Sequence, residues 1–372
     1  MWPFLLLCIA KVVNNSLLCN FFVSYCLMIC FMVLLLWRKS KEKMKMNRVN
    51  ATFAWIACLL CLAFGLSASA SKPRRIILDT DWWTDVDDAA CVRMLTRAHR
   101  AGKIRLAGIC VDAVRETSLP SLSSFLDYEG CPEIPLGADW EATDYNGTPC
   151  YHQMLAEYGE KTVSPRKAED CVSFYRRLLS KVKGQVDILA VGYPNALARL
   201  LQSPADDFSP LDGRELVRRK VRHLWMMAGN YPQGKENNFT RTERSRKAGA
   251  LLCREWPTEI TFLGYDIGVD VLFGATLDAD DLLHQVVCRL MPQGRRSSWD
   301  PLTAWMAILG DASAVGFGWV RGTNTVDDAT GTNVFVEAPA GKHTYLVRLH
   351  DVPWYEARLD SLLSSTDWRR LK

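Results

Sequence analysis

The sequence predicts an α/β fold with a mostly parallel central sheet and helices on both faces. Three observations favour this class. The composition is globular, with 49% hydrophobic and 23% charged residues. After Ser71, short apolar segments typical of buried strands alternate with amphipathic segments of helical period. A run of acidic residues directly follows the first of these strands, and the strand ends of open α/β sheets are where ligands bind.

The predicted elements follow one another in strand–helix order. The helix at residues 88–99 places Ala89, Val92, Leu95 and Ala98 near one face. Residues 186–191 form a continuous apolar run, as fully buried parallel strands do. No repeat or long linker interrupts residues 71–372, which we interpret as one domain. Strands are expected at residues 75–78, 104–111, 134–137, 186–191, 221–227 and 259–263, helices at residues 88–99, 119–129, 168–182, 195–202, 244–254 and 301–309, and a hairpin at residues 322–349.

Residues 1–70 contain two apolar segments with the features of targeting sequences. The first, at residues 16–37, is long enough to span a bilayer. The second, at residues 51–66, follows Lys45 and Arg48 and precedes small residues at 68–70, which is the layout of a secretory signal peptide. We therefore predict a signal peptide at residues 44–70 and an exported domain, periplasmic or secreted, at residues 71–372. For residues 1–43 two interpretations stay open: an extension from a wrongly assigned start codon, or a membrane anchor through residues 16–37.

The positive charge of the chain belongs to this leader. Residues 1–70 hold seven of the 45 basic residues and one of the 41 acidic residues, so residues 71–372 carry a net charge of −2. A nucleic-acid-binding surface is therefore not expected in the domain. The seven cysteines of the domain include no CxxC pair, so a zinc site is not supported.

Five carboxylates lie within ten residues at the end of the first predicted strand: Asp79, Asp81, Asp85, Asp87 and Asp88. So much negative charge in one place is repulsive unless a cation offsets it. Ca²⁺ and Mg²⁺ prefer oxygen ligands and suit such a cluster. Capping of the following helix, the alternative explanation, accounts for one or two of these residues and not for five. The run therefore predicts a metal-binding or catalytic site.

The acidic run reads DTDWWTDVDDA at residues 79–89 and resembles the longer variant of the Asp-rich motif of inosine–uridine-type nucleoside hydrolases. Further segments resemble other elements of that family in the same order: VGYPN at residues 191–195, AGNYP at 228–232, ENN at 236–238 and SWDP at 298–301. The resemblance extends over most of residues 75–350. It implies a nucleoside hydrolase-like fold for the domain at residues 71–372.

The resemblance also implies a Ca²⁺-dependent enzyme that hydrolyses the N-glycosidic bond of ribonucleosides or related ribosides. In that family the calcium ion holds the 2′- and 3′-hydroxyls of the ribose and the attacking water, and a carboxylate base takes a proton from the water. Carried over by position, the resemblance makes Asp81 a calcium ligand and the catalytic base, Asp88, Asp300 and the carbonyl of Pro194 the other ligands, and Asp87, Asn230, Glu236 and Asn238 the sugar-binding residues.

Two departures from the family concern the leaving group. Trp299 stands where many members have a histidine that protonates the departing base, and Trp82-Trp83 replaces a glycine of the motif. We expect Trp82 and Trp299 to stack on the aglycone of the substrate, with packing in the core as the alternative for Trp82. Asp85 belongs to the longer motif and receives no role. No counterpart of the family's asparagine after the second strand is evident at residues 111–118.

The leading hypothesis is an exported, calcium-dependent N-ribohydrolase acting on a small nucleoside or riboside. A non-catalytic, calcium-dependent protein that binds a sugar or nucleoside is the alternative, supported by the missing histidine. A phosphatase of the haloacid-dehalogenase type is disfavoured because Trp83 occupies a position where that family has threonine or valine. No nucleic-acid partner is expected. The family implies a homo-oligomer, and membrane contact follows only if residues 16–37 form an anchor.

Overall fold

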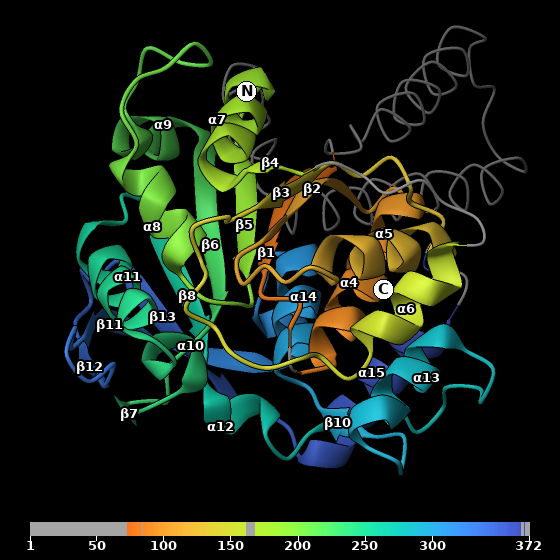
Figure 1. Cartoon of the computed structure of the whole chain (residues 1–372). Helices are drawn as coiled ribbons and strands as arrows, with labels where there is room; N and C mark the ends of the chain where they lie inside the picture. Colours follow the sequence, from red (N-terminus) through yellow and green to blue (C-terminus); the bar gives the residue numbers. More distant parts are fainter. Residues whose placement is uncertain (1–72, 84, 161–167, 366–367, 369–372) are drawn as a thin grey trace, which may run out of the picture. The chain divides into compact units, whose positions relative to one another are not determined.

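An eleven-stranded sheet runs through the described part of the chain, which comprises residues 73–83, 85–160, 168–365 and 368 of the computed structural model (Figure 1). The strand order is β4-β3-β2-β1-β5-β6-β8-β13-β11-β12-β7. The strands from β4 to β13 in this order are parallel, and the remaining strands are antiparallel to their neighbours, so the predicted architecture is confirmed. The strands are β1 (Arg74–Thr80), β2 (Ile104–Val111), β3 (Leu136–Ala138), β4 (Glu169–Asp170), β5 (Val186–Ala190), β6 (Val221–Met227), β7 (Gln233–Gly234), β8 (Glu259–Leu263), β11 (Phe317–Val326), β12 (Asn333–Glu337) and β13 (His343–Arg348), and β9 (Leu272–Phe273) pairs separately with β10 (Arg296–Ser297).

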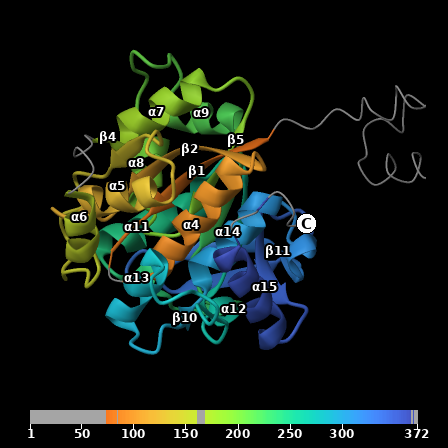
Figure 2. The same ribbon diagram turned by 90° about the vertical axis from the view of Figure 1, so that its right-hand side faces the viewer.

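Helices cover both faces of the sheet, as Figures 1 and 2 show from two directions. Successive residues of β1 point to opposite faces, so Ile76 and Leu78 join one buried apolar cluster and Ile77 joins another. The first cluster lies under α4, α5, α13, α14 and α15, and the second lies under α7, α8, α9 and α11. The helices are α4 (Asp87–Arg100), α5 (Ser118–Tyr128), α6 (His152–Glu160), α7 (Cys171–Lys181), α8 (Asn195–Gln202), α9 (Gly213–Lys220), α10 (Asn237–Thr240), α11 (Glu243–Glu255), α12 (Tyr265–Gly268), α13 (Leu282–Leu290), α14 (Trp299–Leu309) and α15 (Val352–Ser364).

The direction in which the chain adds strands reverses at β1. From β1 the chain builds β2, β3 and β4 on one side and then returns to place β5, β6 and β8 on the other side. At such a switch point the segments that follow two adjacent strands diverge and leave a crevice beyond the strand ends. Here the diverging segments follow β1 and β5, so the crevice opens beside the acidic run.

Local sequence patterns locate most elements, and the C-terminal region is the main exception. Strands β2, β6 and β8 and helix α8 have the predicted bounds. We expected a hairpin at residues 322–349. Strands β11 and β12 form one within this range, but β13 pairs with the other side of β11 and, in parallel, with β8. This pairing covers an edge of the parallel sheet that β8 would otherwise expose. The alternation of apolar residues reports a strand but not its partner, which explains the error.

The leader predicted at residues 1–70 lies outside the described residues. Pro73–Lys372 forms one compact unit. Within the described ranges, no helix is both long and apolar enough to cross a bilayer. The seven cysteines of this unit are free thiols.

Helix α4, which carries part of the acidic run, is anchored by a buried arginine. Arg93 donates through Nε to Glu129 Oε1 at 2.6 Å, and through Nη1 and Nη2 to Asp281 at 2.8 and 2.7 Å. The Arg93 side chain is fully buried and that of Glu129 is nearly so. Glu129 follows α5 and Asp281 caps α13, so one guanidinium joins three helices.

Arg93→Met should lower the free energy of unfolding by about 3–5 kcal/mol, because it leaves the buried Glu129 carboxylate with only its longer contact to Arg97 Nε at 3.4 Å. Denaturant titration of the full-length chain measures this change. The matched control is Arg218→Met, which breaks an exposed pair with Glu215 inside α9 and should have a much smaller effect. Equal destabilisation by the two substitutions would contradict the anchoring role of Arg93.

Candidate functional site

A cavity of about 710 Å³ lies at the carboxyl ends of β1, β5 and β6. Residues that follow these strands line it, together with the beginnings of α4 and α14 and the segment that enters α10. The cavity therefore coincides with the switch point of the sheet. Its lining is rich in carboxylates, and it also holds two aromatic side chains and three basic ones.

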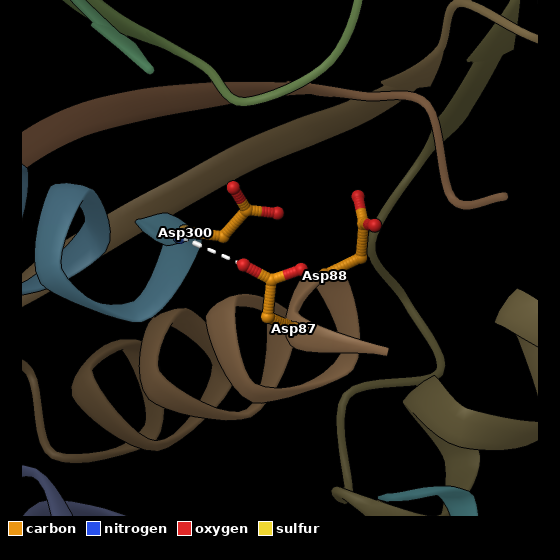
Figure 3. A group of neighbouring side chains, drawn as sticks. All are labelled: Asp87, Asp88 and Asp300. Atoms are coloured by element: carbon orange, nitrogen blue, oxygen red, sulfur yellow. Dashed lines mark hydrogen bonds between the residues drawn. The ribbon is translucent and has the colours of Figure 1, made fainter. Parts of the chain in front are cut away.

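Three of the lining carboxylates converge on one point. Asp87 and Asp88 begin α4 and Asp300 is the second residue of α14, and their carboxylate oxygens lie within 4.8 Å of one another (Figure 3). The backbone N–H of Asp300 donates to Asp87 Oδ2 at 3.2 Å. Two helix N-termini thus meet at the cluster, and the positive ends of their dipoles favour negative charge there.

Burial and mutual repulsion disfavour the ionised form of this cluster. All three side chains are at least 95% buried. Desolvation raises the pKa of Asp87, Asp88 and Asp300 well above the usual range, and the neighbouring carboxylates raise it further. A divalent cation would relieve this repulsion, and Ca²⁺ prefers an all-oxygen donor set of this kind. The three residues therefore fit a calcium site.

Asp81 lies beside the cluster rather than within it. Its carboxyl group interacts with that of Asp88, and burial followed by repulsion from Asp87 and Asp85 raises the pKa of Asp81 to about 7. We expected Asp81 to be a ligand and Asp87 to contact the sugar, whereas the converging set contains Asp87 and not Asp81. Asp87 and Asp88 share the first turn of α4, while Asp81 comes from the preceding loop. The catalytic role of Asp81 stays a prediction.

The structure brings the predicted sugar-binding residues into the same cavity. Glu236 accepts hydrogen bonds from the backbone N–H groups of Asn238 at 2.9 Å and Gly229 at 3.1 Å, and burial raises its pKa to about 7. The Asn238 amide donates to the carbonyl oxygens of Val191 at 3.0 Å and Met227 at 2.9 Å. These bonds join the ends of β5 and β6 to the segment that begins α10.

Asn230 also lines the cavity, and a distant asparagine holds its backbone. Asn333 of β12 accepts from Asn230 N–H at 2.8 Å and donates to the Asn230 carbonyl at 3.0 Å. Asn333 is fully buried. No local sequence pattern identifies Asn333 as a support of the site, because Asn230 lies 103 positions away.

The expectation for Pro194 is not met. Pro194 is the residue before α8, and its carbonyl accepts the N–H of Ala198 at 3.0 Å as the first hydrogen bond of that helix. The residue that lines the cavity after β5 is Val191. Pro194 is not among the residues that line the cavity.

Trp82 packs in the core and does not line the cavity. Its side chain is fully buried, its ring lies against Phe125 and Tyr151, and its Nε1 donates to Ser121 at 2.9 Å. The φ angle of Trp82 is 40°, in a region that favours glycine. The buried contacts of the ring offset that backbone strain. Stacking of Trp82 on an aglycone is therefore excluded.

Trp299 does line the cavity, in the place where the resembling family has a histidine. Its Nε1 donates to the Tyr265 carbonyl at 2.8 Å, and the two rings stack with centroids 5.5 Å apart. Among the described residues, no histidine lines this cavity. His152 is buried against Trp82, and burial lowers its pKa to about 3. Among the described residues, the wall beside Asp300 is thus aromatic and lacks a titrating imidazole.

Comparisons of the sequence with known proteins find no relative. No family model and no curated protein matches the chain. Solved structures do match it, among them five at 13–18% sequence identity. An inosine–uridine preferring nucleoside hydrolase from Bacillus anthracis covers 80% of this chain and 99% of its own, with a TM-score of 0.59. A plant nucleoside hydrolase covers 79% and 99%, with a TM-score of 0.58.

This chain has the fold of the nucleoside hydrolases. The fold alone does not establish catalysis. The type III effector protein XopQ, solved in complex with adenosine diphosphate ribose, matches over 80% of this chain and 94% of its own, with a TM-score of 0.57 and 13% identity. The nucleoside hydrolase fold therefore occurs both in named hydrolases and in effector proteins.

The structure gives partners to Asp112 and Asp85, two carboxylates to which the sequence assigned no role. Asp112 follows β2, and its Oδ1 accepts the N–H of Tyr193 at 3.1 Å, which fixes the turn after β5. Gly192 is needed in that turn, because a Cβ there would lie 2.2 Å from Asp112 Oδ2. Asp85 forms a bidentate pair with Arg296. Asp112 directly follows a predicted strand, and this position could have marked it as a candidate site residue. The pairing of Asp85 with Arg296 is visible only in the tertiary structure.

Asp300→Asn should weaken calcium binding, because it removes one of three converging carboxylates. The loss of affinity should exceed the roughly 10–100-fold that removal of an outer-shell partner causes. Isothermal titration calorimetry of the full-length chain with CaCl₂ measures this. Asp270→Asn is the control, since Asp270 is exposed and pairs with Arg348 outside the cavity. A calcium affinity unaffected by Asp300→Asn would show that the cluster is not the site.

Calcium affinity should rise as the pH increases beyond the usual titration range of aspartate, and binding should release protons. The raised pKa values of Asp87, Asp88 and Asp300 keep protons on the free cluster, and calcium has to displace them. Lower pH adds competing protons and therefore weakens binding. Calorimetry in two buffers of different ionisation enthalpy counts the protons released. Binding without proton release would mean that the cluster is ionised before the metal arrives.

Proposed function

We propose that this protein is an exported, calcium-dependent hydrolase of the N-glycosidic bond in ribonucleosides or related ribosides. The observation that carries the proposal is the buried Asp87, Asp88 and Asp300 cluster, which lies in a cavity at the switch point of a nucleoside hydrolase fold. The ligand class is a small riboside. Nucleoside hydrolases and an effector protein bound to adenosine diphosphate ribose share the fold, which supports that choice.

The arrangement of carboxylates suits water activation. Asp87, Asp88 and Asp300 would hold Ca²⁺, which when bound supplies Lewis acidity toward the water and the ribose hydroxyls. Asp81 lines the cavity next to these residues and would take the proton of the attacking water. A base works best when its pKa lies near the working pH, and the pKa of Asp81 is raised to about 7.

A second group of residues would hold the sugar. Asn230, Glu236 and Asn238 line the cavity. Asn333 of β12 holds the backbone of Asn230, and hydrogen bonds at the ends of β5 and β6 fix the side chains of Glu236 and Asn238. Side chains held in this way lose little freedom when a ligand binds. They can therefore favour the flattened, positively charged sugar of the transition state.

The cellular location belongs to the proposal as well. The signal-peptide layout at residues 44–70 supports export of the domain to the periplasm or the medium, and a membrane anchor through residues 16–37 is retained as an additional interpretation. A homo-oligomer of the exported domain is part of the same proposal.

The second candidate function is calcium-dependent binding of a riboside without turnover. The absence of histidine from the cavity lining of the described residues favours it, and so does the occurrence of this fold in effector proteins. In that case the same carboxylate cluster and sugar-binding residues would retain a ligand instead of cleaving it.

Sugar release separates the two functions. We expect the full-length chain with Ca²⁺ to release ribose from at least one member of a panel of purine, pyrimidine and nicotinamide ribosides. Chelation should abolish release, and Asp81→Asn should lower kcat by about 10²–10⁴-fold because the general base is lost. A reducing-sugar assay with equilibrium dialysis of the same ribosides gives both readouts. Asp270→Asn is the matched control and should behave like the unaltered chain.

Release that requires both calcium and Asp81 would establish the hydrolase. Calcium-dependent binding without release would establish the binding protein and refute catalysis. Neither binding nor release from any member of the panel would refute both functions.

A further inference from the structure

One wall of the cavity carries an arginine and two aromatic rings that water activation does not use. Arg296 comes from β10, Trp299 from α14 and Tyr265 from α12, and all three line the cavity. The Arg296 guanidinium lies 5.0 Å from the centre of the Trp299 ring, and Trp299 stacks on Tyr265 with a 27° angle between the ring planes. Tyr265 is 42% exposed. These residues, named here the base wall, place a cation over the Trp299 ring and the exposed ring of Tyr265 on one side of the cavity.

Asp85 holds the cation of the base wall in place. Arg296 donates through Nε to Asp85 Oδ1 at 2.8 Å and through Nη2 to Asp85 Oδ2 at 2.5 Å. Both carboxylate oxygens therefore face the arginine. Among the described residues no hydrogen bond involves Arg296 Nη1, so its N–H groups are available to a ligand. Because a guanidinium only donates hydrogen bonds, the wall recognises acceptor atoms or negative charge.

The base wall lies where a leaving group would be. Trp299 directly precedes Asp300 of the carboxylate cluster, and Arg296 is close enough to Asp87 to lower its pKa. In a ribose held by its 2′- and 3′-hydroxyls at that cluster, C1′ is bonded to C2′. The base bonded to C1′ would therefore lie close to the residues next to the cluster. The walls around Glu236 and Asn238 hold no aromatic ring among the lining residues, so a heteroaromatic base fits the Tyr265 side.

We propose that Arg296 stabilises the negative charge that the departing base acquires. The preferred leaving groups would then be bases that depart as anions and present acceptor atoms to the guanidinium. This inference rests on the proposed hydrolase function. It assigns a role to Asp85, which positions Arg296, and it accounts for the loss of a histidine at Trp299.

The bonds and charges in this step balance. The water oxygen forms a bond to C1′, and its proton passes to the Asp81 carboxylate. The bond between C1′ and the base nitrogen breaks, and its electron pair leaves with the base as an anion. Arg296 donates hydrogen bonds to that anion, which then takes a proton from solvent. A cationic pyridinium base would leave as a neutral molecule and would gain nothing from Arg296.

A comparison of leaving groups tests the role of Arg296. We expect Arg296→Gln to lower kcat/KM for inosine by about 10²-fold, as removal of one preorganised donor does in other enzymes. For 4-nitrophenyl β-riboside, whose leaving group is already stable as an anion, the loss should be less than about threefold. Nicotinamide riboside should be unaffected or cleaved faster. Retained activity on the nitrophenyl substrate also shows that the variant is folded.

Two further variants complete the test. Arg348→Gln breaks a similar bidentate pair, with Asp270 outside the cavity, and should change none of these rates. Asp85→Asn should reproduce the selective loss on inosine in weaker form, because it removes the carboxylate that positions Arg296.

The outcomes separate the base wall from the proposed function. Equal losses on inosine and the nitrophenyl riboside, or no loss on inosine, would overturn the role of Arg296 while the hydrolase function stands. If the unaltered chain cleaves none of the three substrates, the hydrolase function fails and the base wall fails with it.

Discussion

The burial of several carboxylates in one small volume is the constraint on which the site depends. Two unit charges 4 Å apart repel each other by about 4 kcal/mol at an effective dielectric constant of 20. Asp87, Asp88 and Asp300 lie within 4.8 Å of one another and are almost completely removed from water. Two helix N-termini and one backbone N–H reduce this repulsion but do not cancel it. Protons or a cation must therefore accompany the cluster, which links its chemistry to pH and to calcium.

Holding such a cluster together requires rigid supports on both helices that form it. Helix α4 is anchored by the buried Arg93, which joins it to the residues that flank α5 and α13. Helix α14 is held at its other end, where Arg74 of β1 donates to the carbonyl of Ile308 at 2.8 Å. A cation at that end also complements the negative pole of the helix dipole. Both anchors come from residues far away in the sequence, so the cluster is a product of the whole sheet and not of the acidic run alone.

Different elements would serve the sugar and the leaving base in this cavity. Residues at the ends of β5 and β6 and at the start of α10 hold the side where Glu236 and Asn238 lie. The base wall belongs to α12, β10 and the start of α14. Because the two sides are built from different elements, the base wall can change without disturbing Glu236 and Asn238. The same fold occurs in proteins named as hydrolases and as effectors, and function depends on the site that a fold carries rather than on the fold itself.

The sequence alone determined the fold class, most elements of the parallel sheet and the carboxylates of α4, because hydrophobic periodicity and local charge are properties of neighbouring residues. The resemblance to a family also identified Asp300, Glu236 and Asn238 as site residues, and the structure places all three at the same cavity. Tertiary structure alone decided that Trp82 packs in the core, that Val191 and not Pro194 lines the cavity, and that Asp85 pairs with Arg296. It also decided that β13 joins β8. Each of these depends on a partner or a chain direction set by distant residues, which no local pattern encodes.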